Sequence, residues 1–270
     1  MTMIGSSDSV WTLGWPDLLQ HHELLYFLIW RDIKVRYKQT VLGVIWAIMQ
    51  PLAVALALSV FLGRVVHMQS EILPYPVFAY SGMLLWQLFA QSLTACSNSI
   101  IANEQLISKV YFPRLLVPVS AVLASLLDFV AGVIVLVLFL LFFHIGWTSA
   151  DALLPLFVLP VILSSLGVGL WLSALNVRFR DVRHTINFLV QFWFFATPVA
   201  YPTSSVPARW RLLYDLNPMV GALDGFRWML RGAGPFPTPS VVVSILIGAT
   251  LLLTGLYYFR RTEDTFADLI

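Results

Sequence analysis

The chain has 270 residues, of which 59% are hydrophobic and only 11% are charged, and its formal net charge is +2. A soluble domain of this length carries far more charge, so the composition predicts a polytopic integral membrane protein. The single cysteine, Cys96, excludes an intrachain disulfide framework and a cysteine-based zinc site.

The first predicted element is a helix that begins near Asp17 and leads into the first apolar run. At about 100° per residue, one stripe of this helix is aromatic and apolar, and the stripe beside it is basic. The first stripe holds Tyr26, Trp30, Ile33 and Tyr37, and the second holds Arg31, Lys34 and Lys38. The pattern predicts an amphipathic helix in the membrane interface. An ordinary positively charged anchor beside a first span fits the periodicity equally well.

A membrane span needs about 20 apolar residues, and the sequence meets this requirement six times, with ends shortened where Pro, Asn and Ser cluster. The runs are Gln39–Gly63, Ile72–Asn103, Leu115–Phe143, Ala152–Val177, Thr185–Ala208 and Gly232–Phe259. Eleven of the 16 Lys and Arg residues lie on the side that holds both termini, so both termini are expected in the cytoplasm. The predicted organisation is a cytoplasmic arm and interfacial helix over 1–38 and an all-α transmembrane domain of six spans over 39–270.

Asp128 is the only acid in the interior of an apolar run. Its neighbours on the same helical face are small: Ala121, Ala124, Ser125, Ala131 and Gly132. We expect this face to pack closely against small residues of the fourth run, which gives Asp128 a structural role. The complementary residues expected there are Ser165, Gly169 and Ser173. A proton relay is the alternative, because intramembrane acids are often functional.

Residues 201–237 combine five prolines with aromatic residues and four arginines. The segment is too broken and charged to be a span, yet too aromatic for an ordinary solvated loop. Non-helical backbone at membrane depth is tolerated only against protein or a water-filled cavity. The sequence therefore predicts short re-entrant helices in the outer leaflet between spans five and six.

The sequence gives no positive support for an enzyme. It lacks the phosphate-binding pattern G-x-x-x-x-G-K-[ST], and it also lacks H-E-x-x-H, C-x-x-C and G-x-S-x-G. The acids Asp32, Glu104 and Asp181 of the inner segments form no evident cluster. We therefore expect no catalytic, metal or cofactor site in this chain, and a transport function would take its energy from a partner.

Four motifs resemble a known family in order along nearly the whole chain. The most specific is RDIKVRYKQTVLGVIWAIMQP, which begins at Arg31, and it is followed by SKVYFPR at Ser108, NVRFRDV at Asn176 and LNPM at Leu216. These motifs resemble the membrane subunits of ABC-2 type exporters of bacterial polysaccharides. That family comprises permeases for O-antigen, capsule and teichoic-acid chains.

The resemblance implies a homodimeric permease joined by two copies of a separate ABC subunit, which binds ATP and Mg²⁺. The implied cargo is a polysaccharide on a polyprenyl diphosphate carrier, moved across the bacterial inner membrane. An ABC-2 exporter of a drug, lipid or haem-like molecule is the alternative within transport. A membrane-embedded glycosyl or phosphate transferase is the alternative outside it, and no nucleic-acid partner is expected.

The resemblance and the residue patterns together suggest two sites, one for the lipid carrier and one for the ATPase. The basic residues Arg31, Lys34, Arg36 and Lys38 are expected to bind the diphosphate headgroup. The loop over 103–114 resembles a coupling helix that contacts the ATPase, with Leu106, Ile107, Val110 and Tyr111 as the contacts. On a helix Ile107, Val110 and Tyr111 would share one face. A plain inner loop anchored by Tyr111 and Phe112 is the alternative.

Aromatic residues of the first and fifth runs are candidates for a glycan pathway. They are Trp46, Phe188, Phe192, Trp193 and Phe195, and the three phenylalanines share one helical face. Their rings could stack on sugars, and the resemblance places spans one and five at the centre of a homodimer. Lipid-facing or core aromatics are the alternative.

Overall fold

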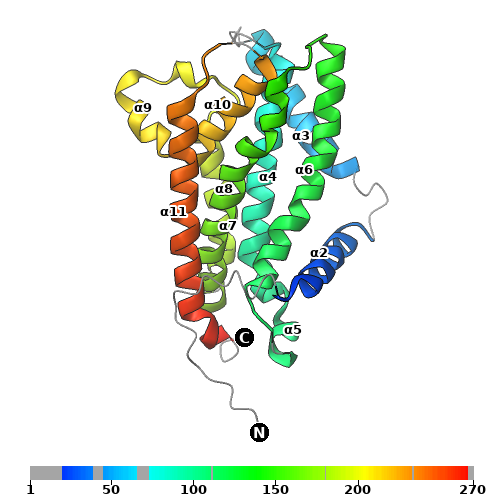
Figure 1. The fold of residues 1–270 in the computed structure, drawn as a ribbon, viewed down its shortest axis with the longest axis vertical. Coiled ribbons are helices and arrows are strands. Elements are labelled where there is room, and N and C mark those ends of the chain that lie inside the picture. Colours follow the sequence, from blue (N-terminus) through cyan, green and yellow to red (C-terminus); the bar gives the residue numbers. More distant parts are fainter. Residues whose placement is uncertain are drawn as a thin grey trace.

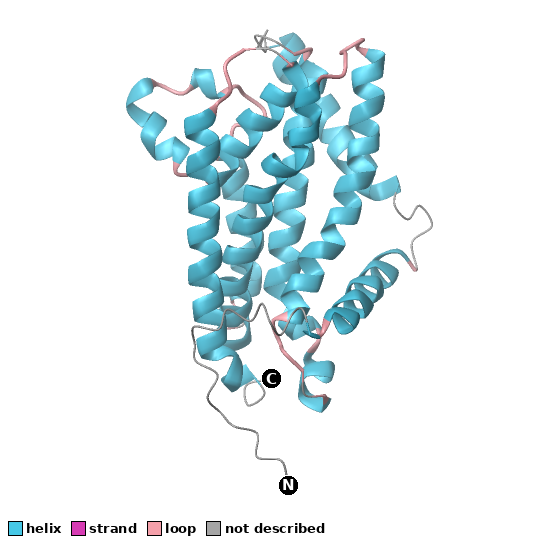
Figure 2. Cartoon of the chain, viewed as in Figure 1, coloured by secondary structure: helices cyan, strands magenta, loops and turns pink. Residues whose placement is uncertain are grey.

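The computed structural model describes residues 20–38, 45–65, 73–110, 112–179, 181–232 and 234–266, and within these ranges it contains only helices and connecting loops (Figure 2). The all-α fold class is therefore confirmed. The α-helices are α2 (His22–Tyr37), α3 (Ile45–Leu58), α4 (Tyr75–Ala102), α5 (Glu104–Lys109), α6 (Leu116–Phe142), α7 (Leu154–Arg178), α8 (Val182–Phe195), α9 (Ala208–Asp215), α10 (Pro218–Arg231) and α11 (Thr238–Thr262). A π-helical segment, η1 (Ser59–Val65), continues α3, and 3-10 turns occur at η2 (Ser149–Leu153), η3 (Thr203–Ser205) and η4 (Glu263–Thr265).

The long helices α4, α6, α7 and α11 run side by side as a bundle (Figure 1). Three described segments are long and apolar enough to cross a membrane: Leu116–Phe142, Ser149–Arg178 and Thr238–Thr265. Most side chains of α4 are buried, because α4 packs against both α6 and α7. The core of the bundle therefore forms around α4 and α7.

Small residues allow α7 to approach its two neighbours closely. A Cβ atom at Gly167 would collide with the backbone of Leu251 and Leu252 on α11, and one at Gly169 would collide with Cys96 on α4. Such small-residue contacts are typical of helices that pack within membranes, where close van der Waals contact replaces the hydrophobic effect. Gly169 was expected opposite Asp128, and this prediction was wrong.

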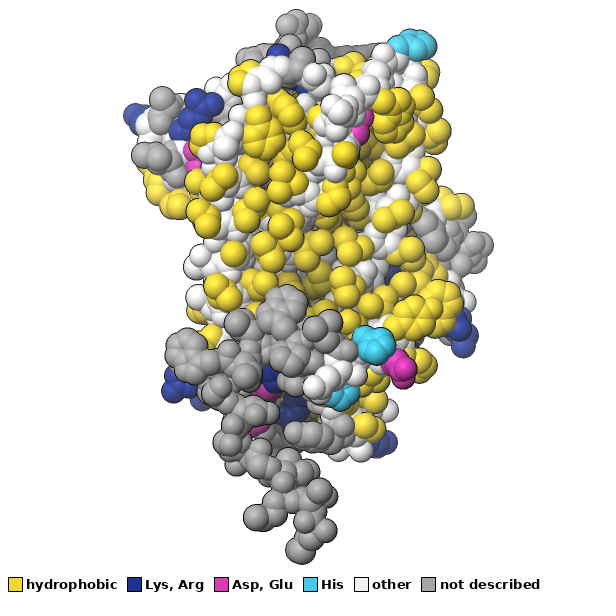
Figure 3. Space-filling model, in the orientation of Figure 1, with side chains coloured by type: hydrophobic (Ala, Val, Ile, Leu, Met, Phe, Trp, Pro, Cys, Tyr) yellow, Lys and Arg dark blue, Asp and Glu magenta, His cyan; other side chains and the backbone are white. Residues whose placement is uncertain are grey.

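On the face of the bundle shown in Figure 3, hydrophobic side chains cover the middle of the molecule. On α6 the exposed residues recur at helical spacing: Val130, Ile134, Leu138 and Leu141. The corresponding residues of α11 are Val242, Leu246, Leu253 and Tyr257. Apolar stripes of this length require apolar surroundings, as in the hydrocarbon of a bilayer.

Shorter helices lie at the two ends of the bundle (Figure 1). At one end α5 lies beneath the bundle and α2 lies obliquely against α6, whereas α9 and α10 lie at the opposite end. The start of α10 follows from the LNPM motif, because the Asn217 side chain accepts a hydrogen bond from the Met219 amide and Pro218 occupies the first turn. Its end follows from Gly232, which adopts the left-handed conformation at φ 65°.

The fifth apolar run is not one continuous helix. Helix α8 ends at Phe195, and Thr197 precedes Pro198, a position at which the α conformation is disfavoured. Its 14 residues rise about 21 Å, which is less than the hydrocarbon thickness of about 30 Å. The chain then turns back into η3 and α9, so the end of the run is shortened at a proline, as expected.

Candidate functional site

Helix α2 is joined to the bundle by a buried ion pair. The Arg36 guanidinium contacts the Asp128 carboxylate on α6 at 2.5 Å, and the Tyr37 hydroxyl donates a second hydrogen bond to it. The Asp128 side chain is almost completely buried, and a buried carboxylate is costly unless it is paired and hydrogen-bonded. Asp128 therefore faces α2, and the expectation that it faces the fourth run was wrong.

The remaining charged residues of α2 and Lys38 after it differ in their partners. Arg31 pairs with the adjacent Asp32 at 2.7 Å, and Asp32 also accepts a hydrogen bond of 3.2 Å from Ser120 on α6. The Lys34 ammonium lies 5.3 Å from the centre of the Trp30 ring, a cation–π distance. Tyr26 and Trp30 are exposed beside these cations, and Lys38 is also exposed. Both arginines of the predicted headgroup site are thus ion-paired, whereas the lysines are not paired with a described carboxylate.

Of the residues expected to contact the ATPase, one is buried in α5 and another is exposed directly after it. Ile107 is 6% exposed and packs in a core cluster with Leu28 of α2 and Phe112, whereas Val110 is 52% exposed. Leu106 lies partly buried beside the same cluster. The helix ends at Lys109 and Val110 is extended, so the helical face expected to contain both Ile107 and Val110 does not form. Tyr111 lies outside the described residues.

The aromatic residues of α8 separate into two groups. Phe188, Phe192 and Phe195 are each about 70% exposed on one face, and the rings of Phe188 and Phe192 stack at 6.4 Å. Trp193 instead packs edge-on against Phe89 of α4 and donates a hydrogen bond of 3.1 Å from its indole nitrogen to Asn217. The predicted shared face of the three phenylalanines is present, and Trp193 points inward. Trp46 on α3 is exposed.

An open groove of about 550 Å³ separates α8 from α9. Its lining is mainly aromatic and aliphatic and includes Phe192, Trp193, Trp210, Leu213 and Tyr214. The Tyr214 hydroxyl is hydrogen-bonded to Tyr201 at 2.6 Å, which fixes α9 to the loop after α8. Burial and the Tyr201 hydrogen bond raise the pKa of Tyr214 above its ordinary value. The groove thus offers aromatic surface beside the exposed face of α8.

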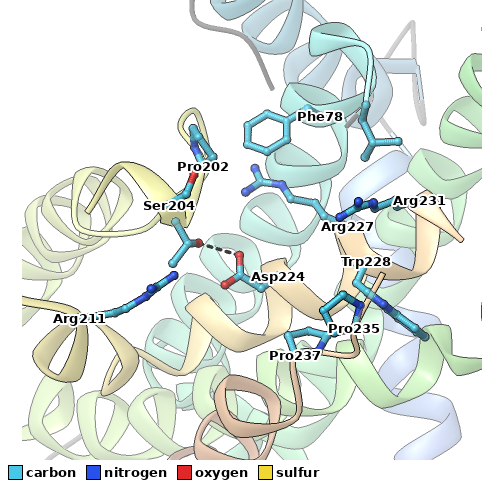
Figure 4. A pocket seen from close by; sticks show the side chains of 12 residues that line it. Phe78, Pro202, Ser204, Arg211, Asp224, Arg227, Trp228, Arg231, Pro235 and Pro237 are labelled. Atoms are coloured by element: carbon cyan, nitrogen blue, oxygen red, sulfur yellow. Dashed lines mark hydrogen bonds between the residues drawn. The ribbon is translucent and has the colours of Figure 1, made fainter. Parts of the chain in front are cut away.

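A second cavity, of about 340 Å³, lies where α9, α10 and η3 meet the start of α4 (Figure 4). Arg227 lies against the Phe78 ring at 3.6 Å and donates hydrogen bonds of 2.7 Å to the carbonyls of Pro198 and Val199. Asp224 accepts a hydrogen bond of 2.7 Å from the Thr203 hydroxyl. Arg227 thus holds the turn after α8 against α4.

Burial governs the charges in this cavity. It lowers the pKa of Arg227 to about 10, which still leaves the guanidinium charged at neutral pH. Burial also raises the pKa of Asp224, although the Thr203 hydrogen bond and the Arg227 charge act in the opposite direction. The cavity is therefore a positively charged environment built into the end of the bundle opposite α5.

Comparison with known proteins decides the family. The family model described as ABC-2 type transporter matches residues 23–230, which is most of the chain. The chain belongs to the ABC-2 type transporter family. It is 31% identical over 255 residues to the O-antigen export system permease protein RfbA of Myxococcus xanthus, covering 92% of this chain and 96% of that protein. It is 29% identical over 252 residues to the protein of the same name from Klebsiella pneumoniae, with 92% and 95% coverage. It is 28% identical over 248 residues to the polysialic acid transport protein KpsM of Escherichia coli, with 88% and 92% coverage.

Two features of this ABC-2 transporter subunit were missed by sequence reasoning. The Arg36–Asp128 pair joins residues 92 positions apart, and no local spacing indicates it. The cavity around Arg227 had a local signal, because Arg227 lies among the apolar residues that bury α10 against the bundle. An arginine on an apolar helical face requires buried partners, and that requirement could have marked it.

Proposed function

We propose that this chain is the membrane-spanning permease subunit of an ATP-driven exporter, and that its cargo is a polyprenyl-diphosphate-linked polysaccharide of the O-antigen, capsule or teichoic-acid type. The observation that carries this proposal is the match to O-antigen export permeases over more than nine tenths of both chains. Because the likeness extends along the entire bundle, it supports a common transport task and not one shared module.

The proposed membrane arrangement has six spans in the bacterial inner membrane. Five are formed by α3 with η1, α4, α6, α7 and α11, and the remaining one by α8 together with the turn that follows it, because α8 alone is too short to cross the hydrocarbon. In this arrangement α2 lies in the interface, and α9 and α10 are the re-entrant helices at the outer side. The α5 end is cytoplasmic, with both termini on that side. The distribution of Lys and Arg supports this orientation, as does the obliquely placed α2 with its exposed aromatics and lysines.

A second copy of the chain is proposed to cover α3 and α8. Three phenylalanines of α8 and Trp46 of α3 remain exposed in the single chain, although the neighbouring residues pack into its core. In a homodimer these rings would line a pathway between the copies, where they could stack on sugar rings. Trp193 would contribute through the groove between α8 and α9, and Phe188, Phe192 and Phe195 through the exposed face.

Energy is proposed to arrive through two copies of an ABC subunit that binds ATP and Mg²⁺. The segment from α5 to Val110 is the proposed contact, because it extends beyond the bundle and presents Val110 outward. Ile107 would support this segment from inside, since it is packed against α2. Motion of the partner could then reach α2 and its headgroup-binding residues directly.

The test of the proposed function is export in cells whose own permease gene is deleted. Cells with the wild-type chain should display the glycan on their surface, and cells without it should accumulate the lipid-linked glycan inside. Changing Val110→Asp should reduce both co-purification of the ABC subunit and display by about tenfold, because a buried unpaired charge opposes docking. The matched control is Val110→Thr, which keeps the shape of the side chain and should retain most of both.

Each outcome separates the alternatives. If the glycan is displayed equally with and without the chain, while a drug, lipid or haem-like molecule accumulates in cells lacking it, the chain is an ABC-2 exporter of another cargo. If Val110→Asp leaves co-purification and display unchanged, the coupling contact is not at α5. Membrane levels of each variant, measured on immunoblots, must match the wild type for the comparison to count.

A further inference from the structure

The cavity between α9, α10 and η3 contains more positive charge than its own structure uses. Three arginines line it, Arg211, Arg227 and Arg231, against the single carboxylate of Asp224. Arg211 and Arg231 are exposed, and neither forms an ion pair with a described residue. Asp224 accepts a hydrogen bond from Thr203 and is not within ion-pair distance of any arginine that the structure describes.

Arg227 at the base of the cavity is buried and incompletely paired. It is 7% exposed, its two terminal nitrogens bond to neutral carbonyls, and its Nε–H has no hydrogen-bond acceptor within the described residues. A buried cation without a carboxylate partner is unfavourable in a folded protein. The cost falls when an anion enters the cavity, because guanidinium groups bind oxyanions through directed, charge-assisted hydrogen bonds.

Helix α9 indicates the level in the membrane at which this cavity opens. Trp210 and Leu213 are exposed on it, Leu216 is exposed directly after it, and Arg209 and Arg211 are exposed beside them. Exposed aromatic and aliphatic residues beside arginines on one short helix are typical of a segment in the membrane interface. Arg211 belongs to both the helix and the cavity, so the cavity opens at the level of lipid headgroups.

We propose that the cavity lined by Arg211, Arg227, Arg231 and Ser204 is a binding site for a lipid headgroup that carries a phosphate and a net negative charge. A volume of about 340 Å³ accommodates a headgroup, and the neighbouring exposed residues of α9 would lie against the acyl or prenyl chain. The Ser204 hydroxyl and the Trp228 ring offer further contacts to polar and sugar groups. An anionic phospholipid and the diphosphate of a polyprenyl carrier both present this chemistry, and the carrier as source rests on the proposed function.

The site can be tested by protection of an introduced thiol. The native Cys96 is fully buried, so Ser204→Cys provides an accessible thiol in the cavity and Gly146→Cys provides one in open space elsewhere. The full chain is placed in nanodiscs of phosphatidylcholine alone, or with added phosphatidylglycerol, or with added polyprenyl diphosphate. Alkylation by a maleimide is then timed. Relative to phosphatidylcholine alone, whose headgroup phosphate is neutralised by choline, an added anionic lipid should slow the reaction at position 204 by about tenfold and leave position 146 unchanged.

Variants of the cavity arginines test whether the slower alkylation is caused by a lipid bound in the cavity. Combining Arg211→Gln with Arg231→Gln should abolish it, and both residues are exposed, so folding should be preserved. Arg209→Gln is the matched control, because Arg209 is on α9 but does not line the cavity. Protection by the diphosphate alone assigns the carrier as the source, protection by phosphatidylglycerol alone assigns an anionic phospholipid, and protection by both assigns anionic phosphate headgroups in general. Equal alkylation rates in all nanodiscs, or protection that survives the double variant, would overturn the proposal. Failure of export leaves this result unaffected, because the assay does not require transport.

Discussion

The arginines at the two ends of the bundle have different partners. On α2 each arginine has a carboxylate, with Arg36 on Asp128 and Arg31 on Asp32. Around the cavity between α9, α10 and η3, Arg227 has only carbonyls and an aromatic ring, and Arg211 and Arg231 have no described carboxylate. Arginines are therefore neutralised by carboxylates at one end of the bundle and leave positive charge available at the other.

This difference changes the interpretation of the basic motif on α2. A cluster of Arg and Lys beside a membrane span predicts phosphate binding, but ion pairing reduces the charge that the arginines can offer. Lys34 over Trp30 and the exposed Lys38 are then the cations most available to a headgroup, with Arg31 and Arg36 orienting the helix. Variants that alter pairing at one end and leave the other unchanged can test the comparison.

The largest effect is expected at Arg227. Changing Arg227→Lys replaces a planar donor that reaches two carbonyls with a compact ammonium group that cannot bridge both. The buried carbonyl left without a donor should lower the free energy of unfolding by about 2–4 kcal/mol. Thermal unfolding of the purified permease, followed by intrinsic fluorescence, measures this loss. The control Arg209→Lys lies on the exposed surface and should change stability little, so equal losses in both variants would contradict the structural role.

The next effect is expected at the tie between α2 and α6. Asp128→Asn keeps the shape of the side chain but leaves the Arg36 charge without a partner, at a cost of about 2 kcal/mol. This cost is below that of a fully buried pair because the Arg36 side chain is 32% exposed. Arg36→Gln should destabilise by a similar amount.

The double variant decides whether the two residues act as a pair. Asp128→Asn with Arg36→Gln should be more stable than the sum of the single losses predicts, which gives a coupling energy of about 1 kcal/mol in a double-mutant cycle. A coupling energy of zero would mean that the contact does not hold α2. Reduced export by Asp128→Asn with unchanged stability would instead favour the proton-relay alternative.

Local sequence patterns predicted where helices occur better than they predicted which helices contact one another. The apolar runs predicted α6, α7 and α11, because a long apolar segment is a local signal. Asn217 and Pro218 at the start of α10 and Gly232 at its end are equally local signals, but Gly232 was expected to begin the sixth apolar run and not to end a helix. The partner of Asp128 lies 92 residues away on a helix that was expected in the interface, and small neighbours indicate a close contact without naming it.

The burial of Ile107 could not be predicted for the same reason: it depends on a contact with another helix. Its position in α5 is evident from the sequence, but the contact with Leu28 depends on where α2 docks. The cavity around Arg227 likewise needs four segments to meet: the start of α4, η3, α9 and α10. Candidate sites that one helix carries alone, such as the phenylalanine face of α8, could be predicted, whereas sites assembled between helices could not.

The smallest effect is expected at the Arg31–Asp32 pair, and it bears most directly on headgroup binding. This pair is partly exposed and joins adjacent residues, so Asp32→Asn should cost less than about 1 kcal/mol of stability. The variant removes the carboxylate that neutralises Arg31 and adds one unpaired cation to α2. Attraction of about 1 kcal/mol per basic residue near an anionic surface predicts a rise of about fivefold in affinity for a polyprenyl diphosphate in detergent, measured by titration calorimetry.

The matched control for this effect is Glu23→Gln, which removes one negative charge from the same helix at an exposed position where the structure shows no ion pair. If only net charge mattered, both variants would raise the affinity equally. If Arg31 binds the headgroup once released from Asp32, the Asp32 variant should gain several times more, and combining it with Arg31→Gln should remove the gain. An Asp32 variant that binds no more tightly than wild type would mean that Arg31 points away from the headgroup. The basic motif would then act through Lys34 and Lys38, with Arg36 serving only to dock α2.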